Sequence, residues 1–187
     1  MHSATLVLVY GDPQRTENPR EKASRIRTGL ERLESIGLPI ERHAVLAELL
    51  VEAGELEQGL LDRELAAHGE ERTGPVREAA SRLTRAVAEA LLASFQSAPV
   101  AAAPVWSTLD DLLALDLPAA VSVSVPEGFA FYGLYPEMYF KAAAELRGGL
   151  LSVIGIRSIG TALAAAVAAA VGEQASAISV RPGGHPF

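Results

Sequence analysis

Residues 151–171 decide the fold, and they read LSVIGIRSIGTALAAAVAAAV. The apolar run 151–154 predicts a buried strand, and the alanine-rich part that begins near Thr161 predicts a helix. Between them lies a tight loop, 155–160, which contains two glycines and one arginine. A strand that leads through such a loop into a helix forms an anion site, because the free N–H groups of the first helical turn point toward the ligand. The small side chains of the helix let it pack closely on a sheet, so this stretch predicts an α/β arrangement.

The candidate ligand-binding residues are the five that end this loop and open the helix: Arg157, Ser158, Ile159, Gly160 and Thr161. Glycine permits the tight backbone geometry of such a turn, and Arg157 would add a charge-assisted hydrogen bond to a bound anion. Many α/β domains make the same turn for packing reasons alone. In that case Arg157 is an exposed loop residue, and the sequence leaves both interpretations open.

The order of residues in the loop also carries a family resemblance. Residues 154–164 resemble the pyrophosphate-binding loop of type I phosphoribosyltransferases, in which an apolar strand, Gly-Ile, a short polar or basic loop with glycine, and Leu-Ala follow one another. Farther on, the strand 177–180 with Arg181 resembles the family's strand that ends in Arg-Lys and leads into a flexible hood loop, although Pro182 stands in place of the lysine. The resemblance extends over residues 119–187.

The resemblance implies a Rossmann-like parallel sheet, and a phosphoribosyl group transferred from phosphoribosyl pyrophosphate to a nitrogen nucleophile. The implied cofactor is Mg²⁺, ligated mainly by the substrate, and Arg181 joins residues 157–161 in the implied pyrophosphate site. No catalytic residue of this chain is assigned by the resemblance. Two alternatives stay open: a non-catalytic regulator that binds a phosphate or nucleotide, and an interaction subunit that has no ligand of its own.

One element of the family has no counterpart in the sequence: an apolar strand, two adjacent acidic residues and a Thr-Gly-rich turn that holds the ribose 5-phosphate. In the family this element follows the hood loop, so we expect residues 118–187 to be the first half of a phosphoribosyltransferase-like domain. We also expect a homo- or hetero-oligomer with a chain that supplies the ribose-phosphate loop, unless this chain is the front part of a longer polypeptide.

Residues 1–117 are predicted to be mainly helical. Before residue 151 we expect strands over 5–10 and 121–125. Helices are expected from Asn18-Pro19 to Gly37, over 41–67, from Gly74-Pro75 to Phe95, over 107–115 and over 136–146. The helix over 41–67 is expected in two pieces, with a break near Gly54. Asp110 and Asp111 are expected in the first turn of the helix 107–115. The helix dipole favours negative charge there, which explains the pair better than a metal site does.

The composition narrows the function further. The chain has no cysteine, which excludes disulfides, thiolate metal sites and cysteine nucleophiles and is typical of a cytoplasmic protein. Its formal net charge of −7 argues against a nucleic-acid surface, whereas a phosphorylated small molecule needs only a few local donors. The longest apolar run, 162–171, is about half the length that spans a bilayer. We therefore expect a phosphorylated small molecule as ligand, and neither nucleic acid nor membrane as partner.

Overall fold

The structure is a computed structural model that describes residues 14–124, 133–146 and 148–183. Its elements, in chain order, are β1 (Gln14–Glu17), α1 (Pro19–Ser35), α2 (Pro39–His68), α3 (Pro75–Phe95), α4 (Ala103–Leu113), β2 (Val121–Ser124), α6 (Pro136–Ala143), the 3-10 turn η1 (Ala144–Leu146), β3 (Leu151–Ile156), α7 (Ile159–Val171) and β4 (Ala175–Val180). The α/β class expected from the sequence is confirmed. The strand expected over 5–10 lies outside the described residues.

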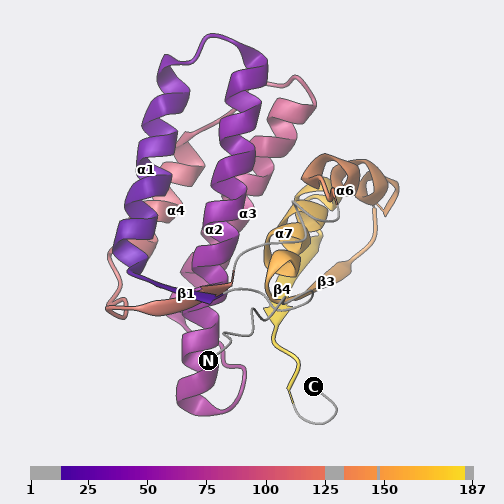
Figure 1. Cartoon of the computed structure of the whole chain (residues 1–187). Helices are drawn as coiled ribbons and strands as arrows, with labels where there is room; N and C mark the ends of the chain where they lie inside the picture. The colour runs from indigo at the N-terminus through magenta and orange to yellow at the C-terminus, as the bar shows by residue number, and fades with distance from the viewer. Residues whose placement is uncertain (1–13, 125–132, 147, 184–187) are drawn as a thin grey trace, which may run out of the picture.

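Helices α1, α2, α3 and α4 lie together in one bundle, and α7 packs against α2 and α3 (Figure 1). The strands β3 and β4 lie against α7, and α6 packs at the end of this unit. One continuous cluster of buried apolar side chains contains residues from α1 through β4, so both of the regions predicted to meet at 117–118 contribute to the same core. No helix among the described residues is long and apolar enough to cross a membrane.

The starts of α1 and α3 follow local sequence signals. The side chain of Asn18 caps α1 by accepting hydrogen bonds from the backbone N–H groups of Arg20 (2.8 Å) and Glu21 (3.4 Å), and Pro19 occupies the first helical position. Helix α3 likewise begins at Pro75. Both predicted helix starts are confirmed.

Helix α4 differs from its prediction over 107–115. It begins at Ala103, so that Asp110 and Asp111 lie near its C-terminal end rather than in its first turn. The helix dipole therefore does not explain this pair, and that part of the prediction is wrong. Ion pairs engage both carboxylates instead: Arg27 Nη2 lies 2.6 Å from Asp110 Oδ1, and Arg82 Nη2 lies 3.5 Å from Asp111 Oδ2.

Helix α2 is one continuous helix of 30 residues, so the predicted break near Gly54 is wrong. Gly54 and Gly59 are instead positions where a neighbouring element comes too close for a side chain. A Cβ added at Gly54 would lie 2.9 Å from Ala162 Cβ on α7, and one added at Gly59 would lie 2.9 Å from Val121 Cγ2 on β2. Glycine costs a helix about 1 kcal/mol relative to alanine, and the packing of α2 on its neighbours outweighs that local preference.

The strands form two separate pairs. β1 is antiparallel to β2, with Gln14 opposite Ser124, and β3 is parallel to β4, with Leu151 opposite Ala175. The strand expected over 121–125 therefore forms, but as the partner of β1. Within the described residues the parallel pairing is limited to β3 and β4, so the larger Rossmann-like sheet implied by the resemblance stays a prediction.

The two outer edges of the β3–β4 pair differ. At the edge of β4, guanidinium groups from α3 cover main-chain carbonyls: Arg85 Nη1 donates to the Ala175 carbonyl (3.2 Å) and Arg77 Nη1 to the Ser179 carbonyl (3.4 Å). On its other side β3 has no strand neighbour among the described residues. Every second residue of β3 therefore directs its N–H and C=O groups away from the sheet.

Candidate anion-binding site

The predicted site residues meet at one edge of the β3–β4 pair. Arg157 follows β3 and Arg181 follows β4, and the carboxyl ends of parallel strands lie at the same edge. The contact is direct, because Arg181 Nη1 donates to the Arg157 carbonyl oxygen at 3.2 Å. The Arg157 N–H group in turn donates to the Val180 carbonyl at 2.9 Å. The structure thus brings together two arginines that are separated by a whole helix in the sequence.

The turn into α7 leaves backbone donors available. Helix α7 begins at Ile159, and the side chain of the preceding residue, Ser158, does not cap it. Thr161 N–H donates to the Ser158 carbonyl at 3.2 Å, whereas the N–H groups of Ile159 and Gly160 have no acceptor among the described residues. Uncapped N–H groups at a helix N-terminus attract anions. Ser158 also has a φ of 119°, a conformation that costs a residue other than glycine about 1–3 kcal/mol.

Arg157 is not an exposed loop residue, since its side chain is 0% exposed. Its Nη1 donates to Asp62 Oδ1 of α2 at 2.7 Å. Its Nη2 donates to the carboxylate of Glu71, in the loop after α2, and to the Ser179 carbonyl oxygen at 3.3 Å. Neither interpretation of Arg157 from the sequence included these two carboxylates. A direct contact between Arg157 and a ligand stays a prediction.

The same two carboxylates hold the other arginines of the site. Arg181 Nη2 lies 2.5 Å from Asp62 Oδ2, and the Arg181 backbone N–H donates to Glu71 Oε1 at 3.0 Å. Arg77, from the first turn of α3, pairs with Glu71 as well. The cluster therefore contains three guanidinium groups and two carboxylates and has one positive charge in excess. Arg181 is its most accessible cation, with a side chain that is 31% exposed against 14% for Arg77.

Both carboxylates are stabilised in the charged form. Burial by itself raises the pKa of Asp62, but hydrogen bonds from Arg181, Gln58 and Arg157 more than offset this, and the pKa lies below its ordinary value. Burial likewise raises the pKa of Glu71, and the hydrogen bond from Arg157 is the chief cause of its net decrease. Asp62 and Glu71 are therefore ionised near neutral pH and hold the arginines by full charge.

Asp62 ends a polar stripe on one face of α2. The other members are Glu52, Glu55 and Gln58, and the spacing of three and four residues places all of them on the same side of the helix. Gln58 binds Asp62 through its Nε2, at 2.5 Å from Oδ2, and accepts from the Ser124 N–H of β2 at 2.9 Å. The stripe was missed in the sequence because leucines and other charged residues of α2 lie between its members.

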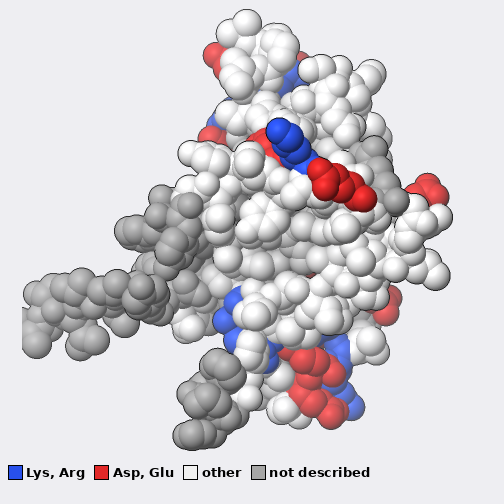
Figure 2. Space-filling view, turned by 90° about the vertical axis from the view of Figure 1, so that its right-hand side faces the viewer, with Lys and Arg blue, Asp and Glu red and all other residues white. Residues whose placement is uncertain are grey.

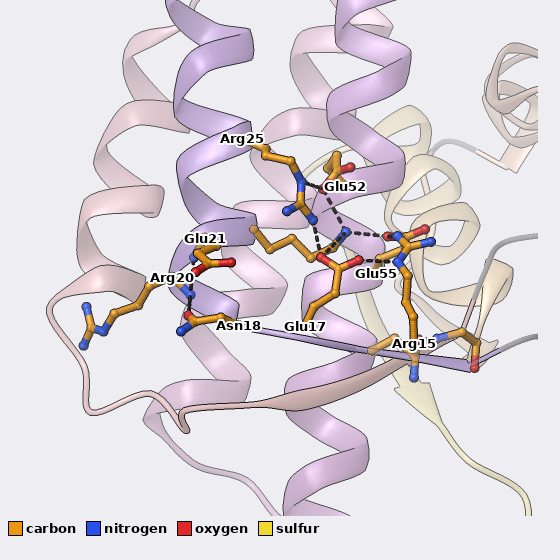
Figure 3. A network of polar contacts seen from close by, with 11 residues as sticks. Arg15, Glu17, Asn18, Arg20, Glu21, Arg25, Glu52 and Glu55 are labelled. Carbon is orange, nitrogen blue, oxygen red and sulfur yellow. Dashed lines mark hydrogen bonds and ion pairs between the residues drawn. The ribbon is translucent and has the colours of Figure 1, made fainter.

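At the far end of this stripe lies a second cluster of charges, drawn in Figure 3. The side chain of Lys22 on α1 is 0% exposed, and its Nζ donates to Glu52 at 2.8 Å and to Glu55. Glu17 lies 4.0 Å from the same nitrogen. Arg15, on β1, also binds Glu55, at 2.5 Å. Because carboxylates surround the ammonium group, we interpret this cluster as a tie between β1, α1 and α2 rather than as a reactive amine.

Metal ligands are not gathered at either cluster. No group of three or more His, Asp or Glu side chains in the described ranges is placed to hold a metal ion. Asp62 and Glu71, the carboxylates nearest the predicted loop, are engaged by arginines.

Comparisons with models of known protein families, with curated proteins and with solved structures found no match.

Proposed function

We propose that residues 158–161 together with Arg181 bind the pyrophosphate group of a phosphorylated small molecule, with phosphoribosyl pyrophosphate as the first candidate. One observation supports this most: the uncapped N-terminus of α7 and two arginines converge at the carboxyl ends of β3 and β4. Helix dipole, free N–H groups and an excess positive charge all favour an anion there. An alternative with the same ligand chemistry is a regulator that binds the pyrophosphate group without turnover.

In this proposal the two arginines have different tasks. Arg181, partly exposed, exchanges one of its contacts with Asp62 for a phosphoryl oxygen. Arg157, fully buried, keeps its carboxylate partners and acts as a positioning residue that holds Asp62, which in turn binds the Arg181 guanidinium. A bidentate guanidinium is well suited to such an exchange, because carboxylate and phosphate present similar oxygen geometry.

The ligand lies on the open side of the turn. The enclosed cavity beside Ser158 and Ile159, also lined by Glu55 and Gln58, measures about 10 Å³. That is room for roughly one water molecule, far too little for pyrophosphate. Ser158, Ile159 and Gly160 are each half-buried, so solvent still reaches the turn.

Phosphoribosyl transfer by this site would depend on positioning rather than on a nucleophilic side chain. Mg²⁺ bound to the phosphate oxygens of the substrate would neutralise part of the leaving group's charge. Because the sequence has no ribose-phosphate loop, we expect this chain alone to bind the ligand without turnover. A second chain or a further segment would supply that loop, and the open edge of β3 is where a strand of such a partner fits. The absence of cysteine supports the expectation of a cytoplasmic protein.

A second candidate function is that of an interaction subunit without a ligand. Ile154 and Ile156 on β3 are 62% and 63% exposed, and Ile178 beside them on β4 is 48% exposed. Figure 2, which views the molecule from the side of α6 and β3, shows a broad surface with few charged side chains. An exposed apolar face next to an open strand edge is typical of a protein-binding surface.

Isothermal titration with Mg-pyrophosphate and with phosphoribosyl pyrophosphate tests the first candidate. Arg181→Gln should weaken binding at least about tenfold, because it removes one charge-assisted contact. Arg32→Gln is the matched control, since it removes an exposed arginine on α1 that pairs with Glu48. Arg157→Ala should also weaken binding at least about tenfold, once circular dichroism has shown that this variant folds.

Two results would overturn the anion site: no heat with either ligand, or equal affinity for Arg181→Gln and Arg32→Gln. Size-exclusion chromatography with light scattering then tests the second candidate. A concentration-independent monomer would speak against a self-associating subunit, whereas a dimer that Ile154→Lys dissociates would support the β3 face as the contact.

A further inference from the structure

A second cavity lies on the other side of α7, between α3, α4 and β4. Its volume is about 380 Å³, which is within the range of small-molecule sites. Five small apolar residues contribute to its wall: Ala86, Pro104, Ala164, Ala165 and Ala177. None of Arg77, Arg157 and Arg181 lines it, although its wall includes Thr161, whose backbone belongs to the proposed pyrophosphate site, and Ser179, whose carbonyl accepts from Arg157.

Three buried polar side chains meet in the wall of this cavity. Glu57 of α2, Thr161 of α7 and Ser179 of β4 are 5%, 3% and 2% exposed. Thr161 Oγ1 and Ser179 Oγ have no hydrogen-bond partner in the described part of the chain. Leaving a buried hydroxyl unpaired costs about 1–3 kcal/mol. Two unpaired hydroxyl groups at one cavity therefore favour a ligand that forms hydrogen bonds with them.

In its protonated form, Glu57 offers both kinds of hydrogen-bonding group. Burial raises its pKa, and hydrogen bonds from Thr84 and Ser81 reduce the increase without cancelling it. Ser81 Oγ donates to Glu57 Oε1 at 2.7 Å. A protonated carboxyl group carries a donor O–H beside an acceptor C=O. This pair of atoms matches a cis amide edge, in which N–H and C=O groups are adjacent.

The two arginines at the rim, Arg82 and Arg85, already have carboxylate partners and do not require a charged ligand. Arg85 Nε pairs with Glu89 at 2.6 Å, and its two terminal nitrogens donate to the carbonyls of Ala175 (3.2 Å) and Gly172 (3.1 Å). Arg82 Nη2 lies 3.5 Å from Asp111. Both cations are thus neutralised by neighbouring carboxylates, and an uncharged molecule is the occupant that suits the apolar wall.

We propose that this cavity is a binding site for a neutral small molecule with a lactam or carboxamide edge, which pairs with the Glu57 carboxyl group and with the hydroxyls of Thr161 and Ser179. The remainder of the ligand is apolar and packs on the alanines of α7. The site goes beyond the pyrophosphate proposal and does not depend on it.

Titration of the ¹⁵N-labelled chain with 2-pyridone, followed by NMR, tests the site. A ligand of this size should bind with a millimolar Kd, and the shifted amides should lie in α3, in the first turns of α7 and in β4. N-methyl-2-pyridone has the same ring and carbonyl without the N–H group, so it should bind about tenfold more weakly. Toluene, with no polar group, should bind more weakly still.

Matched variants locate the contact. Thr161→Val and Ser179→Ala each remove one hydroxyl at nearly constant volume and should weaken 2-pyridone about threefold to tenfold. Ala165→Leu should abolish binding by filling the space. Arg181→Gln should leave 2-pyridone binding unchanged, so failure of this proposal and failure of the pyrophosphate proposal can be told apart. Absence of shifts at the solubility limit, equal affinity for toluene and 2-pyridone, or full binding by both hydroxyl variants would overturn it.

Discussion

Gly155 of β3 lies in direct contact with Gly160 of α7: a Cβ added at Gly155 would lie 2.1 Å from the Gly160 carbonyl oxygen. No real side chain tolerates that distance, so strand and helix meet backbone to backbone at the candidate site. Gly155 is therefore required by close approach, whereas a Cβ added at Gly160 would make a tight contact of 3.3 Å with Gly155 C. Neither has a positive φ, so conformational freedom is not the reason for them.

Gly155→Ala should lower the stability of the fold by about 3 kcal/mol, since overpacking forces a shift of α7 or β3. Urea unfolding measures the loss. Gly149→Ala is the control, because nothing lies within 4 Å of a Cβ at Gly149. Equal stability of the two variants would contradict the close contact.

Ser158→Gly should raise stability by about 1 kcal/mol. Relief of the strained backbone is worth about 1–3 kcal/mol, and the greater freedom of glycine in the unfolded chain offsets part of it. The comparison variant is Ser152→Gly on β3, where no such strain exists and a loss of about 0.5–1 kcal/mol is expected. A lower midpoint for Ser158→Gly in thermal or urea unfolding would refute the strain.

Ala166→Leu should lower the melting temperature by several degrees. Ala166 is 0% exposed in the middle of α7, and additional methylene groups in such a place cost about 1–3 kcal/mol. Ala67→Leu, at an exposed position near the end of α2, should melt like the parent. Differential scanning calorimetry of the three proteins decides the point, and an unchanged midpoint for Ala166→Leu would show that α7 is loosely packed.

Lys22→Met should destabilise the protein by about 3–5 kcal/mol, because it leaves the buried Glu55 carboxylate without its closest cation. The exposed pair of Arg32 and Glu48 provides the contrast: Arg32→Ala should cost no more than about 1 kcal/mol. Both values follow from urea unfolding at neutral pH. Similar losses in the two variants would mean that the Lys22 cluster is solvated.

Acid should weaken the fold through Asp62 and Glu71. Both have a pKa lowered by folding, so their stabilising contribution is present above the unfolded values of 3.8 and 4.5 and is lost as the pH falls through the lower folded values. Unfolding free energies measured between pH 7 and pH 2 should therefore decline below about pH 4. Asp62→Asn should be less stable at pH 7 and should show a shallower decline. A decline as steep as that of the parent would assign the effect to other groups.

Local signals in the sequence predicted where helices and strands form better than they predicted which elements pack or pair with one another. Asn18 and Pro19 mark the start of α1 because a cap and a fixed φ act within one turn. Gly54 misled the prediction of α2, since its role is a contact with α7, more than a hundred residues away in the sequence. The strand 121–124 was expected, but its pairing with β1 depends on a distant segment. Periodicity contains no information on such pairings.

At the candidate site, too, the residues close together in the sequence were predicted and their distant contacts were not. The loop that begins at Arg157 was found because strand, glycines and helix follow one another in sequence. Its carboxylate partners, Asp62 and Glu71, lie 95 and 86 residues earlier and were not found. The available signal for Asp62 was the set of polar residues at helical spacing in α2, namely Glu52, Glu55, Gln58 and Asp62.

The different edges of the small parallel sheet limit how copies of this chain could associate. Arginines of α3 occupy the Ala175 and Ser179 carbonyls at the outer edge of β4, so β3 has the more open edge of the two described strands. If two copies join through β3, each consumes the open edge of the other. Such an assembly closes as a dimer with twofold symmetry and has no free end from which a filament could grow.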